Sequence, residues 1–138
     1  MRQATSILTF QTRGRGFVDA TPRISAWAQE QGMEEGLLTL FIRHTSASIL
    51  VQENADPDVL TDLADALGRL APRDHPYHHA TEGPDDMPAH IKAALTATSL
   101  AIPLIGGHLA LGIWQAIYLV EHRDRPHARE IGCHLIGE

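Results

Sequence analysis

The residues with the most evident chemistry lie between positions 75 and 92. This segment holds four histidines, three carboxylates and three prolines, with little apolar material. Long irregular segments of small domains are usually either functional or disordered. Because imidazoles and carboxylates are the common metal ligands and acid–base groups of proteins, their density here predicts an active site.

Within this segment, Asp86 and His90 are four residues apart, so on a helix they share one face. The carboxylate could then share a metal ion with the imidazole or orient it. Alternatively, Asp86 only caps the helix and His90 lies on the surface. His78 and His79 are neighbours and point opposite ways in an extended chain, so one site is expected to use only one of them. The sequence has no HExxH motif and no cysteine pair, so spacing alone does not specify a metal site.

Two polar segments lie between apolar runs. Residues 44–48, His-Thr-Ser-Ala-Ser, include the hydroxyl of Ser46 and could bind a metal, a phosphate or a polar substrate. They could equally form a polar turn whose hydroxyls bond to the backbone. Glu53 and Asn54 would suit a general base and an orienting amide, or be solvated loop residues. Asp56 precedes a proline and is expected to cap a helix.

Three later features have both structural and functional interpretations. Trp114 is expected in the core, whereas Gln115 beside it brings an amide that needs partners if buried. Residues 121–129 form a basic turn in an acidic protein. Solvated charge is the usual explanation, but arginine forks also match phosphate oxygens. Cys133 is interpreted as a small core residue.

The hydrophobic pattern predicts an α+β domain with a mostly antiparallel sheet. Strands are expected at residues 6–11, 37–42, 47–52, 100–104, 109–120 (as one or two strands) and 128–136. The second and third of these are expected to pair through the turn at residues 44–46. Thr21-Pro22, Asp56-Pro57 and Asp86 mark the starts of three expected helices, capped by Thr21, Asp56 and Asp86. The helices do not alternate strictly with the strands, which disfavours a doubly wound sheet.

Bulk properties narrow the class of protein. A chain of 138 residues fits one domain, and 43% hydrophobic residues suffice for a core. The net charge of −6 argues against a general nucleic-acid-binding surface. No apolar run approaches about 18 residues, and the first eleven residues do not form a signal peptide, so neither a membrane segment nor export is expected. One cysteine excludes an internal disulfide, and a cytoplasmic protein is the default expectation.

Several motifs occur in an order that resembles a known family. They are residues 44–48, residues 53–57 (Glu-Asn-Ala-Asp-Pro), 77–79 (Tyr-His-His), 82–92 (Glu-Gly-Pro-Asp-Asp-Met-Pro-Ala-His-Ile-Lys) and 112–115 (Gly-Ile-Trp-Gln). Together they resemble the YjbQ-like family, also called secondary thiamine-phosphate synthase enzymes, over nearly the whole chain. The resemblance implies a single α+β domain with β-sandwich-like sheets and two or three helices, a homotrimer, and a weak ability to join hydroxymethylpyrimidine diphosphate to thiazole phosphate.

The resemblance also implies a set of site residues. The family's shared histidines fall on His44, His79 and His90, and three histidines plus water make a recognised open metal site. Zinc suits such an all-imidazole site best, and magnesium would suit a diphosphate substrate. Arg123 and Arg129 are the better candidates for phosphate binding, since the residues between them fall in a variable region.

These observations support three hypotheses of function. The first is an enzyme for a phosphorylated small molecule, in which His44, His79 and His90 hold a divalent ion. Asp86 or Glu53 would then orient a ligand or act as a base, and Asn54 and Gln115 would position the substrate. The second is a metal-dependent hydrolase of a phosphorylated or cyclic molecule that uses the same groups. The third is an oligomer that binds a phosphorylated metabolite without turnover, mainly through arginine side chains.

Overall fold

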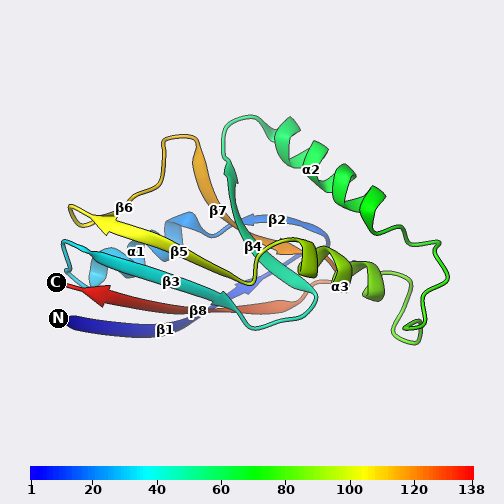
Figure 1. Ribbon diagram of the computed structural model, residues 1–138, viewed down its shortest axis with the longest axis horizontal. Helices are drawn as coiled ribbons and strands as arrows, with labels where there is room; N and C mark the ends of the chain where they lie inside the picture. The colour runs from blue at the N-terminus through cyan, green and yellow to red at the C-terminus, as the bar shows by residue number, and fades with distance from the viewer.

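The computed structural model describes all 138 residues and contains two antiparallel sheets (Figure 1). The larger sheet has the strand order β1-β8-β3-β5-β6, and the smaller has the order β2-β7-β4. The strands of the larger sheet are β1 (Arg2–Gln11), β3 (Gly36–Ile42), β5 (Ser99–Ile105), β6 (His108–Leu109) and β8 (Ala128–Gly137). Those of the smaller sheet are β2 (Gly16–Asp19), β4 (Ala47–Glu53) and β7 (Gln115–Glu121). The predicted α+β class is confirmed.

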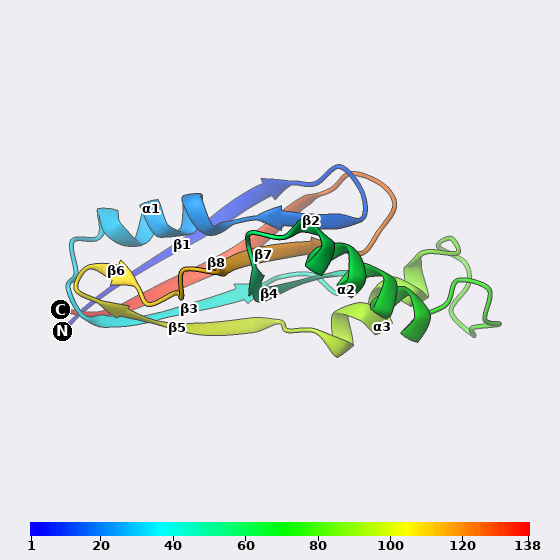
Figure 2. The same cartoon turned by 90° about the horizontal axis from the view of Figure 1, so that it is seen from above.

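The inner face of the larger sheet carries most of the hydrophobic core. Along β8, Ile131, Cys133 and Leu135 are buried, while the residues between them are more exposed. Helix α1 (Thr21–Glu30) and the smaller sheet pack against this face, as Figure 2 shows from above. Burying one such aliphatic side chain stabilises a fold by roughly 2 kcal/mol. Both faces of β7 are buried, because α2 (Pro57–Leu70) covers the side turned away from the larger sheet.

The start of each helix was predicted to within one residue, but two of the caps were wrong. Asp56 does cap α2, where its Oδ1 accepts from the Asp58 N–H at 2.9 Å. Helix α1 has Ala20 at its cap, and the hydroxyl of Thr21 instead accepts from the Ile117 N–H at 2.8 Å. Helix α3 (Asp86–Leu95) begins at Asp86, after Asp85 at the cap position, so the Asp86 side chain is available for other contacts.

The expected pairing of β3 with β4 was also wrong. Strand β3 pairs with β5 and β8, whereas β4 pairs with β7 in the other sheet. The four residues between β3 and β4 cross from one sheet to the other rather than closing a hairpin. An apolar pattern indicates that a segment is a strand but does not identify its partner.

The remaining strand predictions need smaller changes. Strand β1 starts at Arg2 because it pairs with β8 along its whole length. The run at residues 109–120 is interrupted after Leu109 and resumes at Gln115. Trp114 lies in this interruption and is 62% exposed, so it is not a core residue. No helix combines the length and apolar character needed to cross a membrane.

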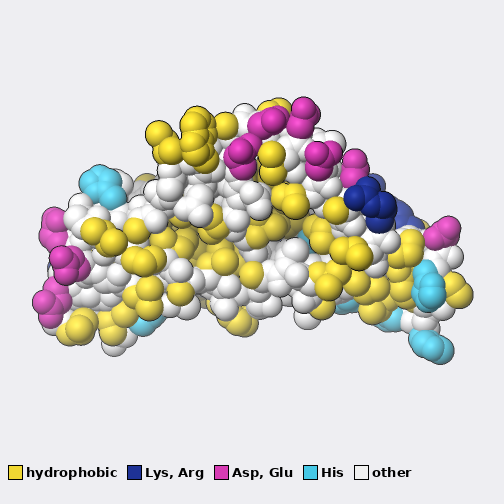
Figure 3. Space-filling model, turned by 45° about the horizontal axis from the view of Figure 1, so that its top comes forward, with side chains coloured by type: hydrophobic (Ala, Val, Ile, Leu, Met, Phe, Trp, Pro, Cys, Tyr) yellow, Lys and Arg dark blue, Asp and Glu magenta, His cyan; other side chains and the backbone are white.

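The helices α2 and α3 and the loop that joins them lie at the end of the molecule opposite the two termini (Figure 1). Histidine side chains gather at this end, while carboxylates line the outer side near α2 (Figure 3). The histidine-rich segment is therefore a loop followed by a helix, which packs beside β4.

Candidate metal site and a neighbouring pocket

Helix α3 and the loop before it bring three potential metal ligands together. The Nε2 of His79, in the loop, is 2.6 Å from Oδ2 of Asp86. One turn along α3, the Nε2 of His90 is 3.2 Å from the same oxygen. The three ligand atoms all lie within 4.8 Å of one another. The structure thus brings together the predicted pair His79 and His90, with Asp86 between them.

The tautomer of His90 suits a metal ligand. Its Nδ1 is 2.9 Å from the carbonyl oxygen of Thr45, and because a carbonyl only accepts, Nδ1 must carry the proton. In the neutral ring, Nε2 then presents a lone pair to the Asp86 carboxylate, which is also an acceptor. Two acceptors this close repel each other unless a proton or a cation lies between them. A backbone carbonyl on the far ring nitrogen is also the usual partner of a metal-bound histidine.

Asp86 is buried yet held in its charged form. Burial by itself would raise the pKa of this carboxyl group. The hydrogen bond from His79, the charge of His90 in its protonated form and the charge of Arg123 outweigh that effect and hold the pKa below its ordinary value. An ionised carboxylate beside two imidazoles is a set of donors that divalent transition ions accept.

Arg123 fixes the carboxylates from the side opposite the histidines. Its Nη1 lies 2.7 Å from Oδ1 of Asp86, and its Nε donates to Asp85 at 2.9 Å. A third bond runs from Nη2 to the carbonyl oxygen of Glu82 at 3.0 Å. The loop turns at Gly83, whose φ of 104° is a conformation that favours glycine. Arg123 was predicted to bind phosphate, but in this structure its guanidinium is used to hold the loop against α3.

His44, the predicted third metal ligand, does not join this group. Its Nε2 accepts from the Glu130 N–H at 2.8 Å, so this lone pair already has a structural partner. Burial, with the nearby charge of Arg129, lowers the pKa of His44 and favours the neutral ring. His44 lines the same shallow hollow as His90, but the third potential ligand atom of the group is a carboxylate oxygen of Asp86.

The predicted catalytic residues Glu53, Asn54 and Gln115 lie together at the other end of β4. A strand of seven residues separates them from the histidine group by roughly 20 Å. Glu53 Oε2 accepts from the Asp56 N–H at 3.1 Å, and Gln115 Oε1 accepts from the Gly112 N–H at 2.7 Å. The Asn54 amide donates to the carbonyl oxygens of residues 113 and 115. These side chains therefore stabilise turns, and Glu53 has a structural role that the sequence did not indicate.

Arg129 and Ser46, predicted to bind phosphate or a cofactor, are buried against each other. The Nη2 of Arg129 donates to Ser46 Oγ at 3.0 Å, and its Nε donates to Glu121 Oε1 at 2.8 Å. Glu121 is fully buried and also accepts from the Thr12 hydroxyl at 2.7 Å. The Nε and Nη2 donors of Arg129 are therefore engaged within the protein.

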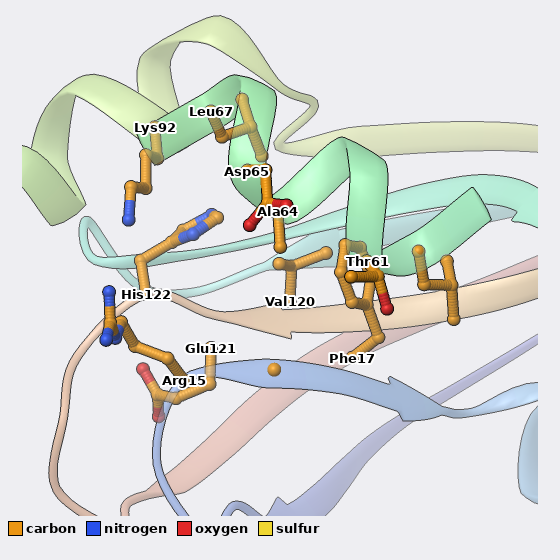
Figure 4. A pocket seen from close by; sticks show the side chains of 12 residues that line it. Arg15, Phe17, Thr61, Ala64, Asp65, Leu67, Lys92, Val120, Glu121 and His122 are labelled. Carbon is orange, nitrogen blue, oxygen red and sulfur yellow. The ribbon is translucent and has the colours of Figure 1, made fainter. Parts of the chain in front are cut away.

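A pocket of about 410 Å³ lies between α2, α3 and the ends of β2 and β7 (Figure 4). Lys92 and His122, for which the sequence predicted no role, form part of its wall. The Nε2 of His122 is 2.8 Å from Ser48 Oγ, and burial lowers the pKa of this histidine to about 4. A signal for Lys92 was present in the composition, because it is the single lysine of the chain.

Comparison with known proteins identifies the family. The family model described as UPF0047 protein YjbQ-like matches residues 6–138. A UPF0047 protein of Synechocystis is 53% identical over 138 residues, which cover 99% of this chain and 94% of the relative. The chain belongs to the YjbQ-like UPF0047 family. The YjbQ protein of Escherichia coli O157:H7 is 41% identical over 132 residues, covering 95% of this chain and 96% of that protein.

Solved structures of the family share this fold. A Thermus thermophilus protein matches with a TM-score of 0.85 at 37% identity, covering 95% of this chain and 99% of its own. A Clostridium acetobutylicum member of the YjbQ/UPF0047 family matches with a TM-score of 0.87 at 34% identity, with the same coverage. The arrangement of the two sheets and three helices is therefore that of YjbQ-like proteins.

Proposed function

We propose that this YjbQ-like protein is an enzyme that uses a divalent metal ion to act on a phosphorylated small molecule. The observation that carries the proposal is the convergence of His79, Asp86 and His90 on one point. Two histidines and one carboxylate with an open side form a recurrent catalytic ligand set. The loop presents this set at the surface, since the His79 side chain is 41% exposed, so a substrate could reach it.

The ligand chemistry favours zinc, because two of the three donors are imidazoles. Magnesium is the alternative if a diphosphate group of the substrate supplies further oxygen ligands. A bound ion would supply positive charge to stabilise a departing phosphate or diphosphate. The protein's own contribution is to hold Asp86 ionised and His90 in the Nδ1–H tautomer.

The reaction that we propose is the formation of thiamine phosphate, following the family resemblance. Diphosphate would leave the methylene carbon of the pyrimidine, and the thiazole nitrogen would then bond to that carbon. The net charge of −6 means that a phosphorylated substrate needs local positive charge, which the metal site would provide. We also propose that the protein acts in the cytoplasm and, following the family resemblance, as a homotrimer.

Metal binding is the first test of this proposal. Purified protein is loaded with zinc, freed of excess ion by gel filtration and analysed for metal content. We expect about one ion per chain, and a strong loss in the His79→Ala and His90→Ala variants. The matched control is His78→Ala, which removes the neighbouring imidazole from the same loop and should leave the content unchanged. Sub-stoichiometric metal that none of these substitutions alters would contradict the proposal.

Turnover is the second test. Zinc- and magnesium-loaded protein is supplied with hydroxymethylpyrimidine diphosphate and thiazole phosphate, and in parallel with a panel of phosphate esters and lactones. Metal-dependent formation of thiamine phosphate that His90→Ala abolishes would support the synthase reaction. Much faster hydrolysis of a panel member would assign the same site to a hydrolase instead. Metal binding with no turnover of any substrate would favour a binding protein.

A further inference from the structure

Lys92 is a buried cation without a partner. Its residue is 7% exposed, and no carboxylate, carbonyl or hydroxyl of the protein pairs with its ammonium group. Every fully buried side-chain nitrogen or oxygen in the molecule has a hydrogen-bond partner. The Lys92 nitrogen must therefore open onto the pocket, and Figure 4 shows it pointing from α3 toward His122. An unpaired charge in such a place is costly unless an anion can reach it.

The surroundings of Lys92 add positive charge. Arg15, on the same pocket wall, and Arg73 both pair with Asp124, at 3.1 Å and 2.6 Å. The Asp124 carboxylate thus pairs with two guanidinium groups and forms no bond with Lys92. Burial of Lys92, followed by the charges of Arg15 and Arg73, lowers its pKa, whereas the charge of Asp124 acts in the opposite sense.

The acidic residues of the wall do not neutralise this end of the pocket. Glu121 is paired with Arg129, and Asp65 is an exposed residue of α2 with no bond to Lys92. On the same side, His122 uses Nε2 on Ser48, and no protein atom bonds its Nδ1. The Lys92 ammonium group and Nδ1 of His122 therefore have no partner within the protein, and Arg15 is shared with Asp124.

The other end of the pocket is apolar. It is lined mainly by Phe17, Leu60, Ala64 and Val120. Figure 4 shows Phe17, with Thr61 beside it, on the side away from Lys92 and Arg15, and shows Ala64 and Val120 in between. A volume of about 410 Å³ lies within the range of small-molecule sites. We infer that this pocket binds a phosphate monoester with an aromatic or apolar body. The phosphate contacts Lys92 and Arg15, and the body packs against Phe17 and Val120.

This inference deepens the proposed function and rests on it in one respect, because it identifies where a phosphate of the substrate sits. Lys92 is two residues beyond His90 on α3, and His122 immediately precedes Arg123, so the pocket adjoins the metal group through two shared segments. The binding of an anion in the pocket requires neither a metal nor turnover, and it can be measured separately.

Calorimetric titration with phenyl phosphate tests the pocket, with inorganic phosphate and benzyl alcohol as the two half-ligands. We expect phenyl phosphate to bind more tightly than either one, and Lys92→Met to weaken it about tenfold or more, because a charge-assisted contact is lost. Arg125→Met, which removes an exposed arginine outside the pocket, should leave binding unchanged. Equal binding by Lys92→Met and wild type overturns the inference, as does benzyl alcohol binding as tightly as phenyl phosphate.

A second measurement uses the wild-type protein, so its result does not depend on whether the Lys92→Met variant folds. Because Lys92 is the single lysine, reductive methylation labels only its amine and that of Met1. Phenyl phosphate should slow labelling of Lys92 and leave Met1 unaffected, as peptide mass spectrometry would show. Equal rates at Lys92 with and without phenyl phosphate contradict the inference. If the wild-type protein fails the zinc test while the His79→Ala/His90→Ala variant still binds phenyl phosphate, the proposed function alone is contradicted.

Discussion

At the scale of single residues, Asp86 links the two histidines of the candidate metal site to Arg123. One of its oxygens faces the imidazoles of His79 and His90, and the other faces the guanidinium of Arg123. Removing any one of these partners therefore removes a contact and also makes the buried charge of Asp86 less favourable.

Replacing Arg123 by Met should cost about 3 kcal/mol of unfolding free energy, because it removes the guanidinium that lies 2.7 Å from the buried Asp86 carboxylate. Arg73→Met is the matched control, since it breaks an exposed arginine–aspartate pair that is worth about 0.5 kcal/mol. Urea unfolding of both variants measures the difference. Equal losses would show that Arg123 does not compensate a buried charge.

His122 should make stability depend on pH. Its pKa is about 4 in the folded protein, against 6.5 in the unfolded chain. Above pH 6.5 neither state binds the proton, and the full stability is present. As the pH falls from 6.5 to 4, the unfolded chain is protonated first, and stability decreases by up to about 3 kcal/mol.

Unfolding curves of wild type and His122→Gln across this window measure that effect. The difference between them isolates His122 from His44, whose pKa is lowered too. The contribution of Asp85 to the stability of the fold is lost at lower pH, because the pKa of its carboxyl group is about 2. Parallel curves for the two proteins would rule out His122 as the source.

The sequence predicted part of this site for clear physical reasons. Asp86 and His90 are local on one helix, so their spacing was sufficient to place them together. His79 was selected through the family resemblance. Lys92 and His122 come from segments far apart in the chain, and only the fold shows that one pocket joins them. The neutralisation of Arg123 and Arg129 by carboxylates likewise depends on tertiary contacts.

At the scale of elements, the strands and helices were predictable but their partners were not. Strand β4 pairs with β7, more than sixty residues later in the chain, and no local pattern specifies such a partner. Helix α2 shows the same limit, because its amphipathic pattern indicates a helix but not how firmly it is held. None of its residues is buried, whereas α1 buries Ile24 and Ala28.

Hydrogen exchange should therefore be faster in α2 than in α1. Few buried contacts mean that α2 can open locally without unfolding the sheets. Exchange measured by mass spectrometry on peptides of both helices tests this prediction. Protection of α2 equal to that of α1 would mean that another surface, such as a second subunit, covers this helix.

At the scale of the whole molecule, the outer face of the larger sheet exposes several apolar side chains. Ile7 and Phe41 both lie opposite Gly132 of β8 and are 51% and 53% exposed. They form a small apolar patch across three neighbouring strands, which the row of Thr5, His134 and Thr39 separates from Ile136. This surface supports the proposed homotrimer, since exposed apolar groups of this kind commonly mark subunit contacts.

Phe41→Glu should convert the assembly to smaller species, because it places a charge in the proposed contact. Light scattering coupled to size-exclusion chromatography gives the mass of each variant directly. Glu30→Gln in α1, away from this surface, serves as the control. A trimer that persists in Phe41→Glu would locate the contact elsewhere, and a monomeric wild type would contradict the homotrimer.

The most direct test of the proposed metal site is a crystal structure of zinc-loaded protein with anomalous data collected at the zinc edge. We expect one strong peak per chain, bonded to His79 Nε2, Asp86 Oδ2 and His90 Nε2. We also expect His44 Nε2 still to accept from the Glu130 N–H. No peak at this group, or a peak bound through other residues, would contradict the proposed metal site.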